Sequence, residues 1–374
     1  MATIFMLVNY TPQDRSIGIT KKIAAQIAAM QRLGHQVFYT AYVDGGTAVF
    51  DNEGNLVCRR TFPVQQRKLV GLIRYGQLLA TAQDFMARYD GKIDLCYGRI
   101  SAPNRAYLNL LRVLKDRGAK IVLEALSYFP GMKPKALKSK YISFYLNKNK
   151  KALRQLVDKF ITEGEVKDFF GIPTEKGKIG VDAENFPIHK YCGDPQVLNM
   201  ISVATEREYH GYDRLINSLA AYKAAGGQQK IYIHLVGGLY SSTIELIKKH
   251  GLEDSVIVYG RVCGSALDEI YAKCNLGVGP LGQHRVGGKK DTGLKTKEYF
   301  GIGQPYFYSG VEEDVPAEYP YVFEVPSDES MIDFDAVWAF YTRIREDENK
   351  ADNMRTYAKN VFSWDSIMQR ALQI

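Results

Sequence analysis

The stretch Asp291-Thr-Gly-Leu-Lys-Thr-Lys-Glu-Tyr-Phe-Gly-Ile-Gly-Gln-Pro305 carries the strongest fold signal in this chain. The short apolar run Asn275–Val278 precedes it and predicts a buried strand. The pattern changes at about Gly293, and Leu294–Phe300 predicts a helix that Pro305 cannot continue. A buried strand, a glycine-containing loop and a helix form one repeat of an α/β protein in which strands and helices alternate.

The start of this helix offers the chemistry of a diphosphate site. The first N–H groups of a helix have no partner within the helix and lie at the positive end of its dipole, so they favour a diphosphate. Glu298 lies five residues beyond Gly293, which is about 7 Å along a helix and close to the separation of a ribose from its pyrophosphate. A carboxylate there can accept from two ribose hydroxyls. An ordinary surface helix whose glutamate has a structural partner is the alternative.

The segment resembles the donor-site motif of retaining family-4 glycosyltransferases of the GT-B fold. In that motif a Glu, a Phe-Gly-Leu and a second Glu fall within nine residues. Gly293 and Leu294 match the Gly-Leu, Thr292 directly precedes them, and Glu298 matches the second Glu, which is the ribose ligand in the family. The chain departs from the motif at the first Glu, whose position holds Lys290.

A second motif narrows the resemblance. Tyr209-His-Gly-Tyr-Asp-Arg-Leu-Ile216 is similar to the Trp-His-Gly-Tyr-Asp-Arg signature of a bacterial subgroup that builds capsular polysaccharide and exopolysaccharide. Members of that subgroup carry a Leu-Lys-Thr-Arg-Glu-Tyr block, which Leu294–Tyr299 nearly repeats, and they too lack the first Glu. The resemblance implies a retaining enzyme that transfers sugar from a nucleoside diphosphate sugar to a growing, lipid-linked glycan, with no further cofactor.

The composition and length of the chain limit the class of protein that it can be. A chain of 374 residues suits two domains, and 46% apolar with 24% charged residues is ordinary for a globular protein. No apolar run approaches the roughly 18 to 20 residues of a membrane span. The segment Met1–Asn9 has no basic stretch before its strand pattern, so we expect no signal peptide. Five scattered cysteines without a Cys-x-x-Cys pair indicate neither disulfides nor structural zinc, which favours the cytoplasm.

Charge is distributed unevenly along the chain. Residues 1–190 hold 30 Lys and Arg against 16 Asp and Glu, whereas residues 191–374 hold 19 against 25. Residues 125–157 hold eight Lys and Arg and no acidic residue, interleaved with aromatic side chains. Because no nucleic-acid motif is present, we expect this basic segment to attach the protein to anionic lipid of the inner membrane leaflet. A solvated helical face is the alternative.

Strand and helix patterns alternate along the whole chain, as in a doubly wound α/β protein. In the first half, helices are expected over 17–33, 69–88, 102–117 and 136–158. The periodicity breaks around Phe186–Pro195, which predicts a linker. The expected architecture is therefore a Rossmann-like acceptor-binding domain over 1–190, a Rossmann-like donor-binding domain over 191–350 and a helix over 351–374. The resemblance implies that the domains face across a cleft and that the last helix crosses back to the first domain.

A Rossmann dehydrogenase is the obvious rival, but the first β–α turn argues against it. Asn9–Ile19 contains no Gly-x-Gly-x-x-Gly, and no acidic residue follows at the spacing that a ribose requires. Gly18 instead resembles the glycine turn that approaches the donor from the opposite domain in GT-B proteins. A plain turn at the start of a helix is the alternative.

Several cations are candidates to neutralise the leaving diphosphate. Arg285 and Lys295 are expected to do so together with helix N-termini rather than with a metal ion, and with Glu298 they form the predicted catalytic set. His210 occupies the position of a phosphate-binding lysine in related proteins. Arg261 and Val262 follow a predicted strand where related proteins hold the nucleobase.

The acceptor side carries fewer signals. Arg99 and Glu124 end predicted strands, and Tyr128 follows the second of them, so all three are expected to contact the acceptor or sugar. A buried structural ion pair is the alternative for either charged residue. Two other functions remain open: a GT-B sugar-nucleotide epimerase, and a non-catalytic partner in glycan assembly, which the lysine at position 290 favours.

Overall fold

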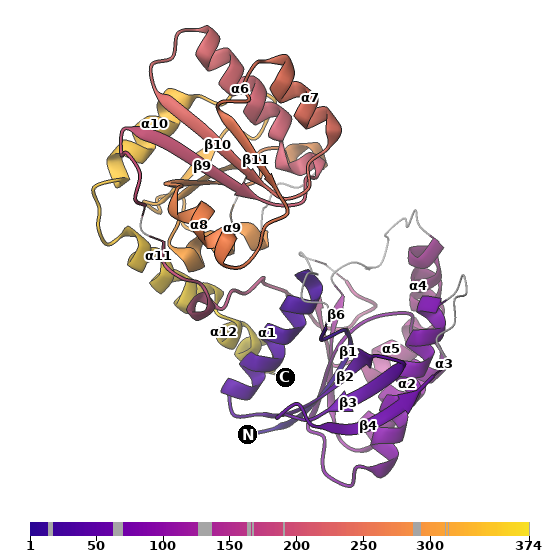
Figure 1. The fold of residues 1–374 in the computed structure, drawn as a ribbon. Coiled ribbons are helices and arrows are strands. Elements are labelled where there is room, and N and C mark those ends of the chain that lie inside the picture. The colour runs from indigo at the N-terminus through magenta and orange to yellow at the C-terminus, as the bar shows by residue number, and fades with distance from the viewer. Residues whose placement is uncertain are drawn as a thin grey trace. The chain divides into compact units, whose positions relative to one another are not determined.

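The chain forms two compact units of similar size. The computed structural model describes residues 1–13, 18–62, 70–125, 137–162, 166, 168–189, 191–286, 293–310, 312 and 314–373. Unit 1 comprises Met1–Lys178 and Trp364–Ile374, and unit 2 comprises Ile179–Ser363. Both units are α/β sandwiches built on a central, largely parallel sheet (Figure 1).

The sheet of unit 1 has β1 at its centre and follows the order β4-β3-β2-β1-β5-β6-β7-β8. All neighbours are parallel except β3, which is antiparallel to β2 and β4. Phe5 and Met6 on β1 are fully buried, because helices cover both faces of this strand. The strands are β1 Thr3–Tyr10, β2 Gln36–Val43, β3 Gly46–Phe50, β4 Leu56–Thr61, β5 Leu95–Arg99, β6 Lys120–Ala125, β7 Lys159–Thr162 and β8 Thr174–Lys176.

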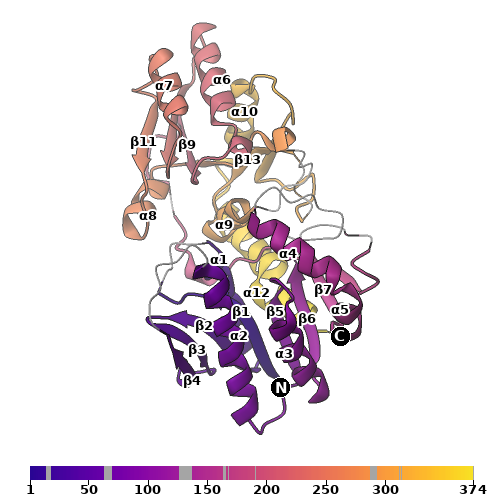
Figure 2. The same cartoon turned by 90° about the vertical axis from the view of Figure 1, so that its right-hand side faces the viewer.

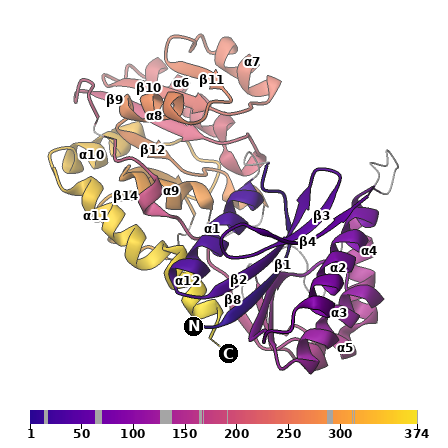
Figure 3. The same cartoon turned by 60° about the horizontal axis from the view of Figure 1, so that its bottom comes forward.

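Two sets of helices cover this sheet. One face carries α1 (Gly18–Arg32) and α12 (Trp364–Ala371), and the other carries α2 (Val70–Arg88), α3 (Arg105–Asp116), α4 (Leu137–Lys148) and α5 (Lys150–Leu156) (Figures 2 and 3). The chain's last helix therefore belongs to unit 1. Its buried residues, among them Trp364 and Met368, join the core under α1, and Arg32 Nε donates to Asp365 Oδ1 at 3.0 Å.

Unit 2 has a parallel sheet in the order β11-β10-β9-β12-β13-β14. Its strands are β9 Val197–Val203, β10 Lys230–Val236, β11 Val256–Gly260, β12 Leu276–Val278, β13 Tyr306–Ser309 and β14 Val322–Val325. Figure 1 shows α6 (Tyr212–Ala224), α7 (Ser241–Lys249) and α10 (Phe334–Ile344) on one face, and α8 (Ser265–Ala272), α9 (Leu294–Ile302) and α11 (Lys350–Tyr357) on the other.

The helix expected from Leu294 is α9, which runs two residues further than predicted. It ends at Gly303, whose φ of 80° is the left-handed conformation that favours glycine. Six of its nine residues are buried, because Tyr299 and Phe300 pack against Tyr306 of β13 and α11 also packs against the helix. This helix is therefore part of the core of unit 2 rather than an ordinary surface helix.

Two local expectations are wrong. The helix expected over 136–158 is interrupted at Asn149, whose side chain turns away to donate to the backbone oxygen of Pro103 at 2.8 Å. The antiparallel strands β3 and β4 were not expected. The two-residue loop Asp44-Gly45, with Gly45 at φ 66°, was the available signal, because Asp-Gly favours a tight hairpin.

The structure divides the chain at different residues from the expected 190/191 and 350/351. Unit 1 ends after β8, where Gly177 N–H still bonds to Thr162 in β7 at 2.7 Å. Val181 already pairs with Ser363 in unit 2. The expected linker, Phe186–Pro195, lies within unit 2, and α11 packs against α9 in that unit, so only α12 returns to unit 1.

Candidate functional site

The strand order of unit 2 locates a ligand site. β9 is the first strand of this unit and lies between β10 and β12, so the chain winds outward in opposite directions on its two sides. The loops that follow β9 and β12 consequently leave the sheet towards opposite faces, and α/β proteins bind ligands in the crevice that such a switch point opens. The His-Gly-Tyr-Asp motif follows β9, and the Gly293-Leu294 motif follows β12.

These two loops are joined through their backbones. The N–H groups of Leu281 and Gly282, after β12, donate to the backbone oxygens of His210 and Tyr209, after β9, at 3.2 and 3.0 Å. Gly211 has a φ of 63°, and a Cβ there would lie 2.9 Å from the carbonyl carbon of Leu281. Only glycine suits this position, both sterically and conformationally. Gly211 therefore allows the loops that follow β9 and β12 to come into contact.

Lys295 reaches across the strand ends from the first turn of α9. Its Nζ donates to Ser202 Oγ at 2.9 Å and lies 5.9 Å from the centre of the Tyr212 ring. Ser202 is the penultimate residue of β9, and its hydroxyl also bonds to the Tyr212 hydroxyl at 2.9 Å. The predicted phosphate-binding lysine is thus beside the motif that follows β9.

His210 is buried and neutral in this cationic surrounding. Its Nδ1 accepts from the backbone N–H of Arg207 at 2.9 Å, which places the ring proton on Nε2. Burial, with the charges of Lys295 and Arg207, lowers the pKa of His210 from 6.5 to about 3. A neutral imidazole can offer one N–H to a phosphate oxygen, while the nearby cations supply the charge.

Glu206 is a residue of this region that the sequence analysis missed. It is buried at the end of the β9 loop, and its carboxylate accepts from the backbone N–H of Tyr240 and the hydroxyl of Thr243, each at 2.6 Å. Its own N–H donates to Gly238 at 2.8 Å. Glu206 therefore fastens the loop after β10 to the loop after β9, close to Arg207.

Arg261 lies near these contacts between the loops that follow β9 and β10. Its guanidinium Nε is 3.8 Å from the place where a Cβ of Gly238 would stand. Gly238 follows β10 and Arg261 follows β11, so the two adjacent loops approach each other at these residues. Val262 packs at the edge of the core of unit 2. The structure thus brings Arg261 towards the same end of the sheet as His210 and Lys295.

Glu298 is half-buried on α9, a position that the rest of the helix fixes firmly. Tyr299 donates its hydroxyl to the backbone oxygens of Ile201 in β9 and Val278 in β12, at 2.9 and 3.1 Å. Lys297 forms a fully buried ion pair with Glu312. The charge of Glu298 also contributes to raising the pKa of the buried Tyr271 phenol, after burial itself.

Arg285 is held by two carboxylates. Its Nε and one Nη bond to Glu329 at 2.7 and 2.6 Å, and the other Nη bonds to Asp213 at 2.7 Å. This pairing with Arg285 and with His284 lowers the pKa of Glu329 to about 2. A diphosphate would have to compete with both carboxylates for Arg285, and the Lys295 ammonium bonds to the Ser202 hydroxyl.

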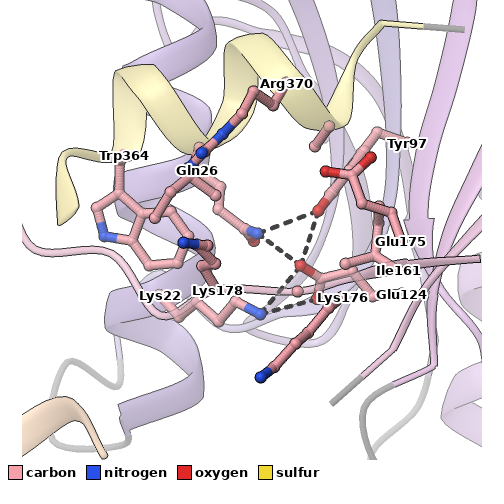
Figure 4. Close-up of a pocket in the computed structure, with 13 residues that line it drawn as sticks. Lys22, Gln26, Tyr97, Glu124, Ile161, Glu175, Lys176, Lys178, Trp364 and Arg370 are labelled. Carbon is pink, nitrogen blue, oxygen red and sulfur yellow. Dashed lines mark hydrogen bonds and ion pairs between the residues drawn. The ribbon is translucent and has the colours of Figure 1, made fainter. Parts of the chain in front are cut away.

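The predicted acceptor residues lie in unit 1. Arg99 is the last residue of β5 and is paired in register with Glu124 in β6. The Glu124 carboxylate is buried and bonds to Lys22 on α1, Gln26 on α1 and Tyr97 on β5 (Figure 4). Lys22 lowers the pKa of Glu124 against the opposing effect of burial. Glu124 therefore forms a buried structural ion pair, which is the alternative to the expected contact with the acceptor or sugar.

Other predicted residues are placed only in part. Gly18 opens α1 at the switch point of unit 1, where β1 lies between β2 and β5. Thr292 and Lys290 in the donor motif, and Tyr128 on the acceptor side, lie outside the described residues.

One sequence signal was overlooked in the expectation of metal-free chemistry. The chain contains an Asp-x-Asp triplet, Asp333-Phe334-Asp335. Asp333 caps α10 by accepting from the N–H of Ala336 at 3.0 Å, and Asp335 accepts from the Tyr222 hydroxyl at 3.1 Å. Both carboxylates thus support α10. In the part of the chain that the structure describes, no group of three or more His, Cys, Asp or Glu side chains is arranged to hold a metal ion.

Comparisons with known proteins identify the fold. No family model and no curated protein matches this chain. Among solved structures, a glycosyltransferase from Rickettsia africae matches with a TM-score of 0.61 at 14% identity, covering 99% of this chain and 97% of the other. Sucrose-phosphate synthase from Thermosynechococcus elongatus matches with 0.59 at 15%, over 99% and 97%. Anabaena HepE in complex with UDP-glucose matches with 0.57 at 14%, over 99% and 98%. The chain therefore has the GT-B fold of glycosyltransferases.

Proposed function

We propose that this protein is a retaining glycosyltransferase that uses a nucleoside diphosphate sugar. The observation that carries the proposal is the convergence of Lys295, neutral His210 and the N-terminus of α9 at the switch point of unit 2. It has further support from fold neighbours, because HepE of Anabaena is described in complexes with UDP and with UDP-glucose. These loops are joined through backbone and buried contacts, so their charges need little rearrangement when an anion binds.

Each group has a distinct role in this proposal. Lys295, the His210 Nε2–H and the first N–H groups of α9 bind the diphosphate and stabilise the charge that develops on it as the sugar leaves. Glu298 accepts from the ribose hydroxyls, and the Arg261-Val262 turn lies against the base. With retention, the donor phosphate itself takes the acceptor proton. Arg285 contributes by orienting the loop after β12 through its carboxylate partners, rather than by direct contact alone.

The acceptor in this proposal is a glycan carried on lipid at the inner face of the membrane, in cell-surface polysaccharide synthesis. The support is α4, which presents one exposed stripe of Lys140, Phe144 and Lys148, with the ammonium of Lys148 5.7 Å from the Phe144 ring. Tyr141 and Tyr145 pack towards the core instead. No helix in the described ranges is long and apolar enough to cross a membrane.

Nucleotide binding by Glu298→Ala tests the proposal. The substitution removes a charged acceptor of ribose hydroxyls, so affinity for nucleoside diphosphates should fall by about 1.5–3 kcal/mol, roughly tenfold to 150-fold. Calorimetry with UDP, GDP and ADP measures the change and identifies the base. Glu245→Ala, an exposed glutamate on α7 in the same unit, is the matched control. Unchanged affinity in a folded Glu298→Ala protein would remove the basis of the donor site.

Turnover separates the enzyme from its alternatives. Hydrolysis or transfer of the sugar from the nucleoside diphosphate sugar that binds best is expected, with release of the nucleoside diphosphate. Conversion to an epimeric sugar nucleotide without release would identify an epimerase. Tight binding without any reaction, in the presence of membrane extract as an acceptor source, would identify a non-catalytic partner.

A further inference from the structure

Arg214, in the sequence motif that follows β9, is a buried cation to which the proposed function gives no role. It is the third residue of α6, and its side chain is 1% exposed. Burial lowers the pKa of Arg214 below the ordinary value of an arginine, yet a guanidinium stays protonated in proteins. A buried charge is costly unless the protein supplies hydrogen-bond partners, so the partners of Arg214 indicate what this cation holds in place.

The guanidinium bonds to two backbone oxygens that are distant in the sequence. Its Nη1 donates to the oxygen of Leu281, in the loop after β12, at 2.9 Å, and its Nε donates to the oxygen of Ser330, between β14 and α10, at 2.8 Å. Its Nη2 lies 3.8 Å from Asp328 Oδ1 and has no hydrogen-bond partner among the described residues. Arg214 therefore ties two loops of unit 2 to α6 through their backbones.

The contact with Leu281 leads directly to His210. The N–H of Leu281 donates to the backbone oxygen of His210 at 3.2 Å, and the next N–H, that of Gly282, donates to the backbone oxygen of Tyr209 at 3.0 Å. These two oxygens belong to the last two residues of the 3₁₀ turn η2 (Glu208–His210). A guanidinium that fixes the peptide of Leu281 consequently also fixes the turn that carries the imidazole.

A second contact holds the same loop from its exposed side. Asp213, next to Arg214 on α6, accepts from Arg285 Nη1 at 2.7 Å. Arg285 belongs to the 3₁₀ turn η3 (Gln283–Val286), which packs against η2. The side chain of Asp213 is 52% exposed, and solvent weakens ion pairs of this kind. The buried contacts of Arg214 therefore determine the position of the loop more strongly than Asp213 does.

The loop after β12 depends on Arg214 more than the segment after β14 does. Ser218, one turn further along α6, accepts from the backbone N–H of Ile332 at 2.9 Å, so α6 holds that segment by a second bond. Among the described residues, no side chain other than Arg214 bonds to the backbone of Leu281 or Gly282. Loss of the guanidinium should consequently loosen the contact between the loops that follow β9 and β12.

We propose that Arg214 is a positioning residue of the donor site, which holds Leu281 and Gly282 so that their N–H groups keep His210 in place for a diphosphate. This role rests on the proposed function, because that function supplies the ligand. Arg214 acts through His210 rather than by touching the ligand, since its nitrogens face two backbone oxygens and Asp328. Its removal should therefore matter only while His210 is present.

A double-mutant cycle on the full chain separates positioning from a general loss of stability. Arg214→Met should weaken binding of the nucleoside diphosphate that binds best by about tenfold, as measured by calorimetry on folded protein. In a His210→Asn background the same substitution should change affinity by less than about twofold, because the group that Arg214 positions is already absent. Arg214→Lys keeps the charge but lacks the planar fork of donors, so it should recover only part of the affinity. If Arg214→Met does not fold, Arg214→Lys takes its place in the cycle.

Equal losses in the two backgrounds would overturn the inference, because a purely structural role does not depend on His210. Full recovery of affinity in Arg214→Lys would also overturn it. Arg345→Met is the matched control, since Arg345 donates to the backbone oxygen of Pro195 at 3.3 Å, before β9 in the same unit. This variant also loses a bond from a guanidinium to the backbone, but its affinity should equal that of the wild type.

Hydrogen exchange tests the same contact without a ligand. The backbone amides of Leu281 and Gly282 should exchange faster in Arg214→Met or Arg214→Lys than in the wild type, and Arg345→Met should not change them. Unchanged exchange would overturn the inference whether or not a nucleotide binds. Absence of nucleoside diphosphate binding by the wild type would instead contradict the proposed function, so the two can fail separately.

Discussion

Replacing Lys297 by an uncharged residue should lower the free energy of unfolding of unit 2. Lys297 and Glu312 form an ion pair whose side chains are both 0% exposed, and the ammonium also lies 4.3 Å from the centre of the Phe362 ring. Lys297→Met keeps the length of the side chain but leaves a buried carboxylate without its cation. Breaking a buried pair in this way costs about 3–5 kcal/mol, whereas exchanging both partners for neutral groups costs far less. Lys297→Met/Glu312→Gln should therefore be more stable than Lys297→Met alone.

The two tryptophans allow unit 2 to be followed separately. Trp338 lies on α10 in unit 2 and Trp364 on α12 in unit 1. In a Trp364→Phe background, urea unfolding monitored by fluorescence reports the transition of unit 2 through Trp338. The wild-type pair, both single variants and the double variant form a thermodynamic cycle. A loss below about 1 kcal/mol in Lys297→Met, or a double variant as unstable as the sum of the singles, would refute the argument, because a buried pair couples its members.

Three further outcomes are expected. Nucleotide affinity and turnover should survive EDTA, and complete loss that Mg²⁺ or Mn²⁺ restores would contradict metal-free transfer. Lys140→Gln/Lys148→Gln should weaken sedimentation with anionic vesicles by about 1 kcal/mol per lysine at low salt, whereas Lys248→Gln/Lys249→Gln on α7 should not; equal binding would make α4 a solvated face. The free energy of unfolding should fall as pH decreases from about 6.5 towards 3, by at most about 1.4 kcal/mol per pH unit. In this range His210 binds a proton in the unfolded state but stays neutral in the folded state, where its pKa is about 3. Titration of urea midpoints shows this slope, and an identical slope in His210→Gln would refute its origin.

Most of the fold was predictable because it rests on strongly periodic segments. The helices expected over 17–33 and 69–88 lie within one residue of the bounds of α1 and α2, and the strand expected over Asn275–Val278 lies within one residue of β12, because each is a clear periodic or continuous apolar pattern. The antiparallel strands β3 and β4, which form one end of the sheet of unit 1, were missed. Strand β4 alternates exposed and buried residues weakly, so its Asp44-Gly45 turn was a stronger signal than the strand itself.

Site residues were predictable where a motif depends on the local backbone conformation. They were less predictable where a side chain pairs with residues that are distant in the sequence. The His-Gly motif marked a position that requires glycine, because the backbone of Leu281 leaves no room for a Cβ at Gly211. Arg285 was chosen for its charge, but its carboxylate partners Asp213 and Glu329 lie 72 and 44 residues away in the sequence. Glu206 was missed for the same reason, since its partners follow a different strand. Pairings of this kind depend on tertiary contacts that local patterns do not contain.

The two units place their buried charges in different ways, and the difference supports separate roles. In unit 2, Lys295 and His210 lie in the segments that follow β12 and β9, and burial together with the charges of Lys295 and Arg207 keeps His210 neutral, so an arriving diphosphate meets a neutral N–H donor near a lysine ammonium. In unit 1, the charge of Glu124 is already balanced by Lys22 within a hydrogen-bonded network. A preorganised set of donors and cations favours binding and stabilising an anion, whereas an ion pair within a hydrogen-bonded network fixes geometry. This is the division expected when one unit holds the leaving diphosphate and the other holds a neutral or separately recognised ligand.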